Sequence, residues 1–296
     1  MPPPLFGLNV STSAAAGADP VAEAVRAEEL RFDFVSANDH PSGSSPSFET
    51  WTMLSWIAAR TTEIKVATRV LGVPYRSPAM VAKMAETLNR LSGGRLILGL
   101  GGGYSDHEFR AFGLPVPSPR EKVDGLEEAV NIMRGLWSRE KFTYSGKHHT
   151  TEAAELEPKP DTNIPIWLGT FGPRALAVTG RVADGWIPSL DMAPPSDIPA
   201  LRAIISTAAR ESGRDPDEVS FVYNMEIGIA DQPNPNPEVV VGPVDHVIDR
   251  LIGFVQLGAA AMNFNPIGPD REAQVALLAQ EVIPEVKAAG RNEGSI

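Results

Sequence analysis

The sequence predicts an α/β fold, a closed (β/α)8 barrel of the TIM type, and three observations carry that prediction. Short apolar or β-branched runs alternate with longer amphipathic stretches, which is typical of strands and helices in series. Eight such pairs follow one another, and a strand–helix–strand series forms a parallel sheet with right-handed crossovers. The length of 296 residues suits a closed eight-unit barrel better than an open sheet.

Eight short runs are predicted to be strands because they are apolar and end in polar or turn residues. The predicted strands are Leu5–Val10, Phe32–Ala37, Ile64–Leu71, Arg95–Leu100, Ile164–Gly169, Gly185–Pro188, Val219–Ala230 and Ala260–Asn265.

An amphipathic stretch follows each predicted strand. In the first, Asp19 can cap the helix and Pro20 can occupy its first position. The predicted helices are Asp19–Leu30, Phe48–Arg60, Pro78–Leu91, Pro119–Trp137, Pro173–Val182, Ser196–Ser212, Val244–Leu257 and Arg271–Ala289. No linker rich in Gly, Ser or Pro divides the chain, so residues 1–296 are expected to form one domain.

The alternation stops between Lys141 and Pro160. There the run Phe142–Tyr144, a Ser145-Gly146 turn and the run Lys147–Thr151 predict a small hairpin inserted after the fourth helix. The proline-rich segment Asp231–Pro237 is too short to be a linker and predicts a surface loop.

Charge and composition exclude several classes of function. The net charge is −11, and no stripe of Lys and Arg could neutralise nucleic-acid phosphates or an anionic membrane surface. No apolar segment approaches the roughly 20 residues that span a bilayer. No secretory signal is visible at the N-terminus, so a cytoplasmic protein is expected.

The chain has no cysteine, which excludes disulfides, thiol nucleophiles and Cys-based metal sites. Redox chemistry would therefore need an organic cofactor. No metal site is expected, because carboxylates do not cluster and His148-His149 would alternate across a strand. A metal-dependent hydrolase is accordingly disfavoured.

In a barrel, the chemistry lies in loops at the C-terminal ends of the strands. Asp39-His40 follows the second predicted strand, where the histidine can transfer a proton and the aspartate can tune it or bind a ligand. A simple turn remains an alternative there. Gly72-Val73 follows the third strand and permits close approach of a flat ligand, although these residues taken alone favour a plain turn.

Glycine-rich loops follow the fourth and fifth strands. Gly101, Gly102 and Gly103, before Tyr104, leave backbone bare for a ring, without the spacing of a dinucleotide fingerprint. The run Gly169–Arg174 brings a threonine hydroxyl, helix-start N–H groups and an arginine together, which suits a phosphate. An ordinary strand-to-helix turn is the alternative.

Other features are assigned to structure. The pairs Glu28-Glu29 and Glu127-Glu128 are expected to be solvated helix faces. Trp51 and Trp56 are expected in the core, with Trp51 near enough to the helix start to reach the pocket.

Together these stretches resemble the luciferase-like monooxygenase superfamily over nearly the whole chain. The stretches that carry the resemblance are Ser77–Lys83, Thr87–Arg95, Leu98–Gly101, Glu108-Phe109, Ala111–Gly113, Ile166–Gly169, Pro173–Leu176 and Ala183–Pro188.

Members of that superfamily bind FMN or the deazaflavin coenzyme F420. Asp39-His40 is similar to the deazaflavin-using branch, in which the histidine lies beside the reactive ring. The resemblance implies a cis peptide bond between Gly72 and Val73 that backs the ring. It implies that Gly169, Thr170, Phe171 and Gly172 hold the cofactor's phosphate, with Arg174 beside them.

The resemblance implies hydride transfer between the deazaflavin C5 and an organic substrate. His40 would transfer the proton, Asp39 would support the ring, and Tyr104 and His107 would line the pocket. The sugar-phosphate dehydrogenases of this superfamily carry an acidic residue after the glycine loop, where Tyr104 stands here. Sugar-phosphate oxidation is therefore not favoured over reduction of an organic acceptor.

The alternatives are an FMN-dependent monooxygenase and a non-catalytic deazaflavin-binding relative. A homodimer through the second and third helices is expected. Position alone suggests that Met225, Glu226, Asn263 and Asn265 face the pocket.

Overall fold

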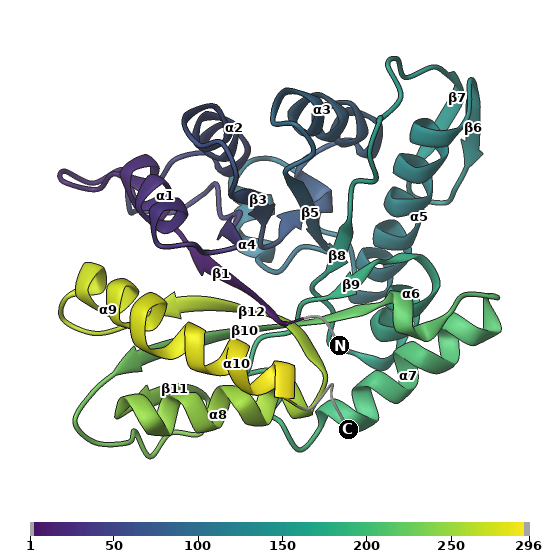
Figure 1. The fold of residues 1–296 in the computed structure, drawn as a ribbon. Coiled ribbons are helices and arrows are strands. Elements are labelled where there is room, and N and C mark those ends of the chain that lie inside the picture. Colours follow the sequence, from purple (N-terminus) through teal and green to yellow (C-terminus); the bar gives the residue numbers. More distant parts are fainter. Residues whose placement is uncertain (1–2, 293–296) are drawn as a thin grey trace.

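In the computed structural model, which describes residues 3–292, eight parallel strands close into a barrel with helices outside it (Figure 1). The barrel strands are β1 (Leu5–Asn9), β2 (Phe34–Ala37), β3 (Lys65–Thr68), β5 (Leu96–Gly101), β8 (Ile166–Leu168), β9 (Gly185–Trp186), β10 (Ser220–Ile229) and β12 (Ala259–Pro266). They follow this order around the barrel, and β12 pairs with β1 to close it. The predicted barrel is confirmed.

The outer layer consists of helices whose apolar faces pack on the strands (Figure 1). The helices of this layer are α1 (Pro20–Glu29), α2 (Thr50–Arg60), α3 (Pro78–Leu91), α5 (Pro119–Ser138), α6 (Pro173–Val182), α7 (Ile198–Glu211), α8 (Val244–Gln256), α9 (Arg271–Leu277) and α10 (Ile283–Asn292). The predicted cap is present, because the Asp19 carboxylate accepts the N–H groups of Val21 and Ala22. None of the helices within residues 3–292 is long and apolar enough to span a membrane.

Several elements differ from the prediction in ways that shape the site. The third predicted strand is interrupted: β3 ends at Thr68, and the short β4 (Leu71–Gly72) then pairs with β5 on its own. A short helix, α4 (Asp106–Ala111), follows the glycine loop, and β11 (Val239–Gly242) extends the sheet beside β10. Two 3-10 turns add Val73–Tyr75 and Pro216–Glu218.

The last predicted helix is divided. A π-helical stretch over Leu278–Val282 separates α9 from α10. Inserting one π turn changes the face that the following residues present, and Leu278 and Val282 are both buried. The division therefore keeps apolar side chains on the barrel along the whole segment.

The inserted hairpin is confirmed as the antiparallel pair β6 (Phe142–Ser145) and β7 (Thr150–Ala154). In the turn of this hairpin, the N–H groups of Lys147, His148 and His149 each donate to the carboxylate of Glu128 on α5 at 2.8 Å. The prediction that Glu128 belongs to a solvated face is therefore wrong. Its carboxylate ties the insertion to the barrel.

Two other glutamates assigned to solvated faces also have structural partners. Glu28 accepts the N–H groups of Thr62, Glu63 and Ile64, which lead into β3. Glu127 forms an ion pair with Arg181 at 2.6 Å. A sequence pattern does not reveal such partners because they come from distant segments.

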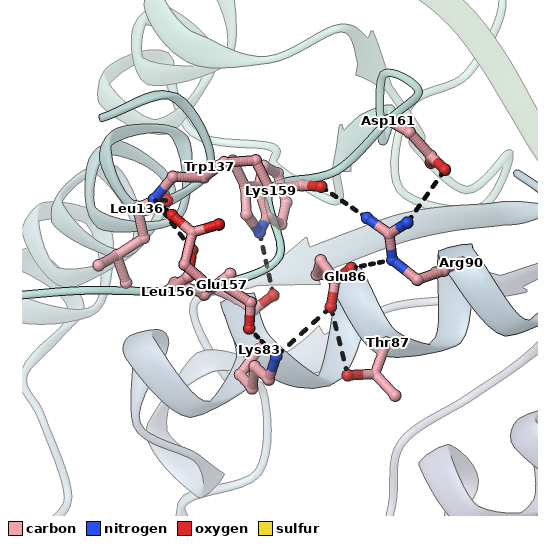
Figure 2. A network of polar contacts seen from close by, with 11 residues as sticks. Lys83, Glu86, Thr87, Arg90, Leu136, Trp137, Leu156, Glu157, Lys159 and Asp161 are labelled. Carbon is pink, nitrogen blue, oxygen red and sulfur yellow. Dashed lines mark hydrogen bonds and ion pairs between the residues drawn. The ribbon is translucent and has the colours of Figure 1, made fainter. Parts of the chain in front are cut away.

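The chain returns from the hairpin to β8 along α3, where a polar network holds it (Figure 2). The buried Glu86 carboxylate receives Arg90 Nε at 2.6 Å and lies 3.6 Å from Lys83 Nζ. Lys83 and Arg90 then donate to the carbonyl oxygens of Glu157 and Lys159. This network fixes the approach of β8 to the barrel.

The barrel interior holds a separate apolar cluster below the catalytic end. It comprises Phe34, Ala67, Ile97, Trp167, Ile187, Val222 and Ala261. Trp51 on α2 is buried as predicted, whereas Trp56 is 62% exposed, so its assignment to the core is wrong. The two tryptophans lie five residues apart on α2, and at about 3.6 residues per turn this spacing places them on different sides of the helix.

Candidate active site at the carboxyl end of the barrel

A cleft of about 280 Å³ lies where the barrel strands end. It is lined by Asp39, His40, Arg69, Val70, Gly72, Tyr75, Gly101, Gly102, Gly103, Tyr104, Ser105, Gly169, Phe171, Ile187, Ser189 and Asn224. Nine of the fourteen residues predicted for the site are among them. The predicted windows after four different strands therefore meet at one place, as the barrel geometry requires.

The cis peptide bond lies between Arg69 and Val70, and the prediction of Gly72–Val73 is wrong. The bond falls in the interruption between β3 and β4, so Val70 rather than Val73 lines the cleft. Val73 is buried in the 3-10 turn that follows. The family resemblance had implied Gly72–Val73, whereas the cis bond lies three residues earlier.

Val70 explains part of the glycine content of the cleft. A methyl group on Gly101 would lie 2.7 Å from Val70 Cγ2, and one on Gly169 would lie 3.2 Å from the same atom. Gly103 has φ +93°, and a methyl group there would lie 2.5 Å from Phe109 Cζ. These glycines let neighbouring side chains pack behind the loop while their backbone faces the cleft.

Asp39 is buried, and its carboxylate is already engaged. It accepts Arg76 Nη1 at 2.8 Å and Nη2 at 3.1 Å, and it accepts the Gly72 N–H at 3.0 Å. Arg76 also reaches Glu49 at 2.5 Å. Burial lowers the pKa of Arg76, but hydrogen bonds and charge from Asp39 outweigh it and raise that pKa. Asp39 thus ties the segment after β2 to β4 and to Arg76.

His40 is held by a carboxylate that the sequence reasoning missed. Its Nδ1 lies 2.9 Å from Glu108 Oε1, and the Tyr75 hydroxyl donates to Glu108 Oε2 at 2.7 Å. Glu108 is buried, whereas the His40 side chain is 47% exposed toward the cleft. Burial, with the Glu108 carboxylate beside it, raises the pKa of Tyr75, so the phenol stays protonated and donates.

The contact between His40 and Glu108 corrects the expectation that Tyr104 stands in place of an acidic residue after the glycine loop. Tyr104 lines the cleft but is 89% exposed, so it stands at the rim. Glu108, on α4, supplies the carboxylate four residues later. His107 precedes it on this helix and is not among the residues that line the cleft.

The predicted phosphate window is only partly available to a ligand. Gly169 and Phe171 line the cleft, but the Thr170 hydroxyl is buried and bonds Thr179 Oγ1 at 2.7 Å. The side chain of Arg174 pairs with Asp124 outside the cleft. Gly172 caps α6, whose first-turn N–H groups remain as the anion-binding feature of this window.

Below the cleft, polar side chains from several strands form a connected layer, here called the polar floor: Asn9, Ser36, Arg69, Ser189, Asn224 and Asn263. Ser36 Oγ donates to Asn263 Oδ1 at 2.9 Å, and Asn263 Nδ2 donates to Asn224 Oδ1 at 2.8 Å. Asn224 Nδ2 then donates to Ser189 Oγ at 2.9 Å. Every buried amide in this row has a partner, which makes the floor rigid.

Arg69 completes the floor on the other side. Its Nε donates to Asn9 Oδ1 at 2.9 Å. Burial lowers the pKa of Arg69, and the charge of Asp191 opposes that effect. The guanidinium therefore lies in a poorly solvated place where the cleft meets a second hollow.

That second hollow, here called the outer chamber, has a volume of about 370 Å³ and shares Arg69, Ser189 and Asn224 with the cleft. Its remaining lining residues are Leu190, Asp191, Met225, Glu226, Asn236, Glu238, Val239 and Asn265. The positional expectation for Met225, Glu226 and Asn265 is met, whereas Asn263 is fully buried in the floor.

No group of three or more His, Asp or Glu side chains in residues 3–292 is arranged to hold a metal ion. The cleft instead combines backbone N–H groups, an imidazole, a guanidinium and several hydroxyl and amide side chains with apolar walls from Val70, Phe171 and Ile187. Such a mixture suits a planar organic ring with polar edges.

Comparisons with known proteins agree with this geometry. The chain is 26% identical to the F420-dependent glucose-6-phosphate dehydrogenase of Nakamurella multipartita, over 97% of this chain and 98% of that protein. It is 34% identical to the enzyme of the same name from Kineococcus radiotolerans, over 64% of this chain and 59% of that protein.

Solved structures share the fold. An F420-dependent secondary alcohol dehydrogenase in complex with an F420-acetone adduct superposes with a TM-score of 0.86 at 22% identity, over 96% of this chain and 99% of that one. The coenzyme F420-dependent tetrahydromethanopterin reductase from Methanopyrus kandleri superposes with a TM-score of 0.82 at 21% identity, over 96% and 99%. The model of the luciferase-like monooxygenase family matches residues 5–235, and the chain belongs to that family.

Proposed function

We propose that the protein is a coenzyme F420-dependent oxidoreductase that moves a hydride between the deazaflavin C5 and an organic substrate. The observation that carries the proposal is the His40–Glu108 pair at the wall of the glycine-lined cleft. The names of the two curated relatives described above support the same cofactor.

The cleft residues fit a deazaflavin. Val70, Phe171 and Ile187 offer apolar contacts for the ring, and Gly101, Gly102 and Gly103 bring the backbone close to it. The first-turn N–H groups of α6 would hold the cofactor's phosphate. When bound there, the deazaflavin accepts or returns a hydride.

His40 would manage the proton that accompanies the hydride. Because the Glu108 carboxylate accepts from Nδ1, that nitrogen carries a hydrogen and Nε2 is left to face the cleft. For an alcohol substrate, Nε2 takes the hydroxyl proton as the carbon loses its hydride and becomes a carbonyl. In the reverse direction the imidazolium returns that proton to the carbonyl oxygen.

The cofactor assignment is tested by titrating the purified protein with oxidised deazaflavin, reduced deazaflavin and FMN. Micromolar or tighter binding of the deazaflavin, with much weaker binding of FMN, is the expected result. Tight binding of FMN with none of the deazaflavin would overturn it and favour a flavin-dependent monooxygenase on this barrel. Turnover that is unaffected by His40→Ala would favour a non-catalytic relative.

We also propose that the chain forms a homodimer through α2 and α3. Trp56, Met80 and Leu91 on these helices are 62%, 58% and 81% exposed, and large apolar side chains gathered on one face commonly mark an interface. Light scattering of the wild type and of Trp56→Glu tests this, and a monomeric wild type would overturn it.

A further inference from the structure

The outer chamber adjoins the cleft and shares Arg69, Ser189 and Asn224 with it, so a substrate lying in the chamber would border a cofactor bound in the cleft. Its wall contains three carboxylates, those of Asp191, Glu226 and Glu238. Arg69 is the one cation among the lining residues that the structure describes.

The single positive charge of Arg69 stands against three carboxylates among the residues that line the chamber. Its Nε is bonded to Asn9, and Asp191 lies close enough to act on its titration. A phosphate entering the chamber would therefore meet three carboxylates and one cation. Asp191, Glu226 and Glu238 are exposed at the wall of the chamber, and their like charge disfavours the binding of a dianion there.

The same wall favours hydrogen-bond donors. Carboxylates are acceptors that can each engage two hydroxyl or ammonium hydrogens, and bonds to a charged acceptor are the strong ones. Asn224, Asn236 and Asn265 add amide groups that can both donate and accept. The chamber is thus lined for a molecule rich in N–H or O–H groups.

We infer that the substrate of the proposed reaction is a non-phosphorylated molecule that presents hydroxyl or ammonium groups to Asp191, Glu226 and Glu238. This inference rests on the proposed function for the reaction, but it concerns the chamber alone. It separates this chain from the relatives that are named for glucose 6-phosphate.

The test compares three probes that differ at one carbon: glucose, glucose 6-phosphate and 6-amino-6-deoxyglucose. Their binding to the purified protein is measured by calorimetry with and without saturating deazaflavin. Glucose and the amino sugar are expected to bind at least about tenfold more tightly than the phosphate. Their relative affinity then decides between a neutral and a cationic substrate.

A matched pair of variants assigns the effect to the chamber. The variant Asp191→Asn, Glu226→Gln, Glu238→Gln should reduce the preference for the amino sugar over the phosphate about tenfold or more. The variant Glu152→Gln, Glu281→Gln, Glu285→Gln makes the same change in net charge at exposed positions outside the chamber. It should leave the preference unchanged.

Equal or tighter binding of glucose 6-phosphate by the wild type would overturn the inference, as would binding of none of the three probes. An equal effect of the two triple variants would also overturn it. Because the deazaflavin titration is a separate measurement, failure of the cofactor assignment and failure of the chamber assignment are distinguishable.

Discussion

Glu108 Oε1 lies 2.9 Å from His40 Nδ1, and the other oxygen of the same carboxylate accepts the Tyr75 hydroxyl at 2.7 Å. One buried carboxylate therefore sets both the direction of the imidazole and the nitrogen that bears its hydrogen. The exposed part of the ring faces the cleft.

Replacing Glu108 with glutamine removes the negative charge that stabilises the imidazolium and lets the side-chain amide hold the wrong tautomer. We expect kcat to fall about 10²-fold or more, in line with the usual range for acid–base catalysis, with little change in deazaflavin affinity. Steady-state kinetics with a cofactor titration measures both. The Tyr75→Phe variant, which keeps the carboxylate, should lose less, and an equal loss would contradict the role given to the charge.

The buried ion pair between Asp39 and Arg76 should be needed for stability. Arg76→Ala leaves a carboxylate whose side chain is 1% exposed without its cation, and such a loss costs about 3–5 kcal/mol of unfolding free energy. Urea denaturation measures it. Arg31→Ala removes an exposed pair with Glu63 and should cost less than about 1 kcal/mol. Similar costs for both variants would refute the burial argument.

Gly103 is expected to accept no side chain. Its φ of +93° disfavours any other residue by roughly 1 kcal/mol, and a methyl group would also meet the Phe109 ring. Gly103→Ala should therefore lower both stability and deazaflavin affinity. Gly17→Ala is the matched control, because φ is +86° there and nothing lies within 4 Å. If the two variants have the same melting temperature, the contact with Phe109 is irrelevant.

Stability should depend on pH through Glu28. Burial raises the pKa of Glu28, but hydrogen bonds from Glu63, Ile64 and Thr62 outweigh it, so the pKa of Glu28 in the folded protein lies below its ordinary value. A group with a depressed folded pKa contributes stability above its unfolded pKa and loses it as pH falls through the folded value.

Glu28→Gln should accordingly destabilise the protein by about 1–2 kcal/mol at neutral pH and by progressively less as the pH falls below about 4. Denaturation midpoints of both proteins across that range measure the difference. Glu29→Gln, at the neighbouring position with one exposed ion pair to Arg26, should show no such trend. A difference that stays constant with pH would contradict the assignment.

Most of the fold follows from local patterning, because strand and helix periodicity recur regularly from Leu5 onward. The interruption between Thr68 and Leu71 does not, since all of these residues suit a strand and only the pairing with β5 divides them. The π turn in the last helix cannot be predicted from the sequence either, because packing of the helix against the barrel determines it.

The sequence predicts which segments contribute to the site, but it does not predict where their side chains point or which partners they bind. His40 is foreseeable because it follows a strand at the catalytic end. Glu108 lies on a six-residue helix that is too short for a periodic signal, and its partners are 68 and 33 residues away. Thr170 and Arg174 have suitable chemistry, yet contacts with Thr179 and Asp124 turn their side chains elsewhere.

The polar floor also links the completion of the barrel to its last strand. Asn263, near the end of the chain, bonds both Ser36 from β2 and Asn224 from β10. Until β12 has been synthesised and has joined the sheet, these two side chains lack their shared partner and β1 lacks its second neighbour. The polar floor and the closed barrel are therefore complete only when the final strand has taken its place.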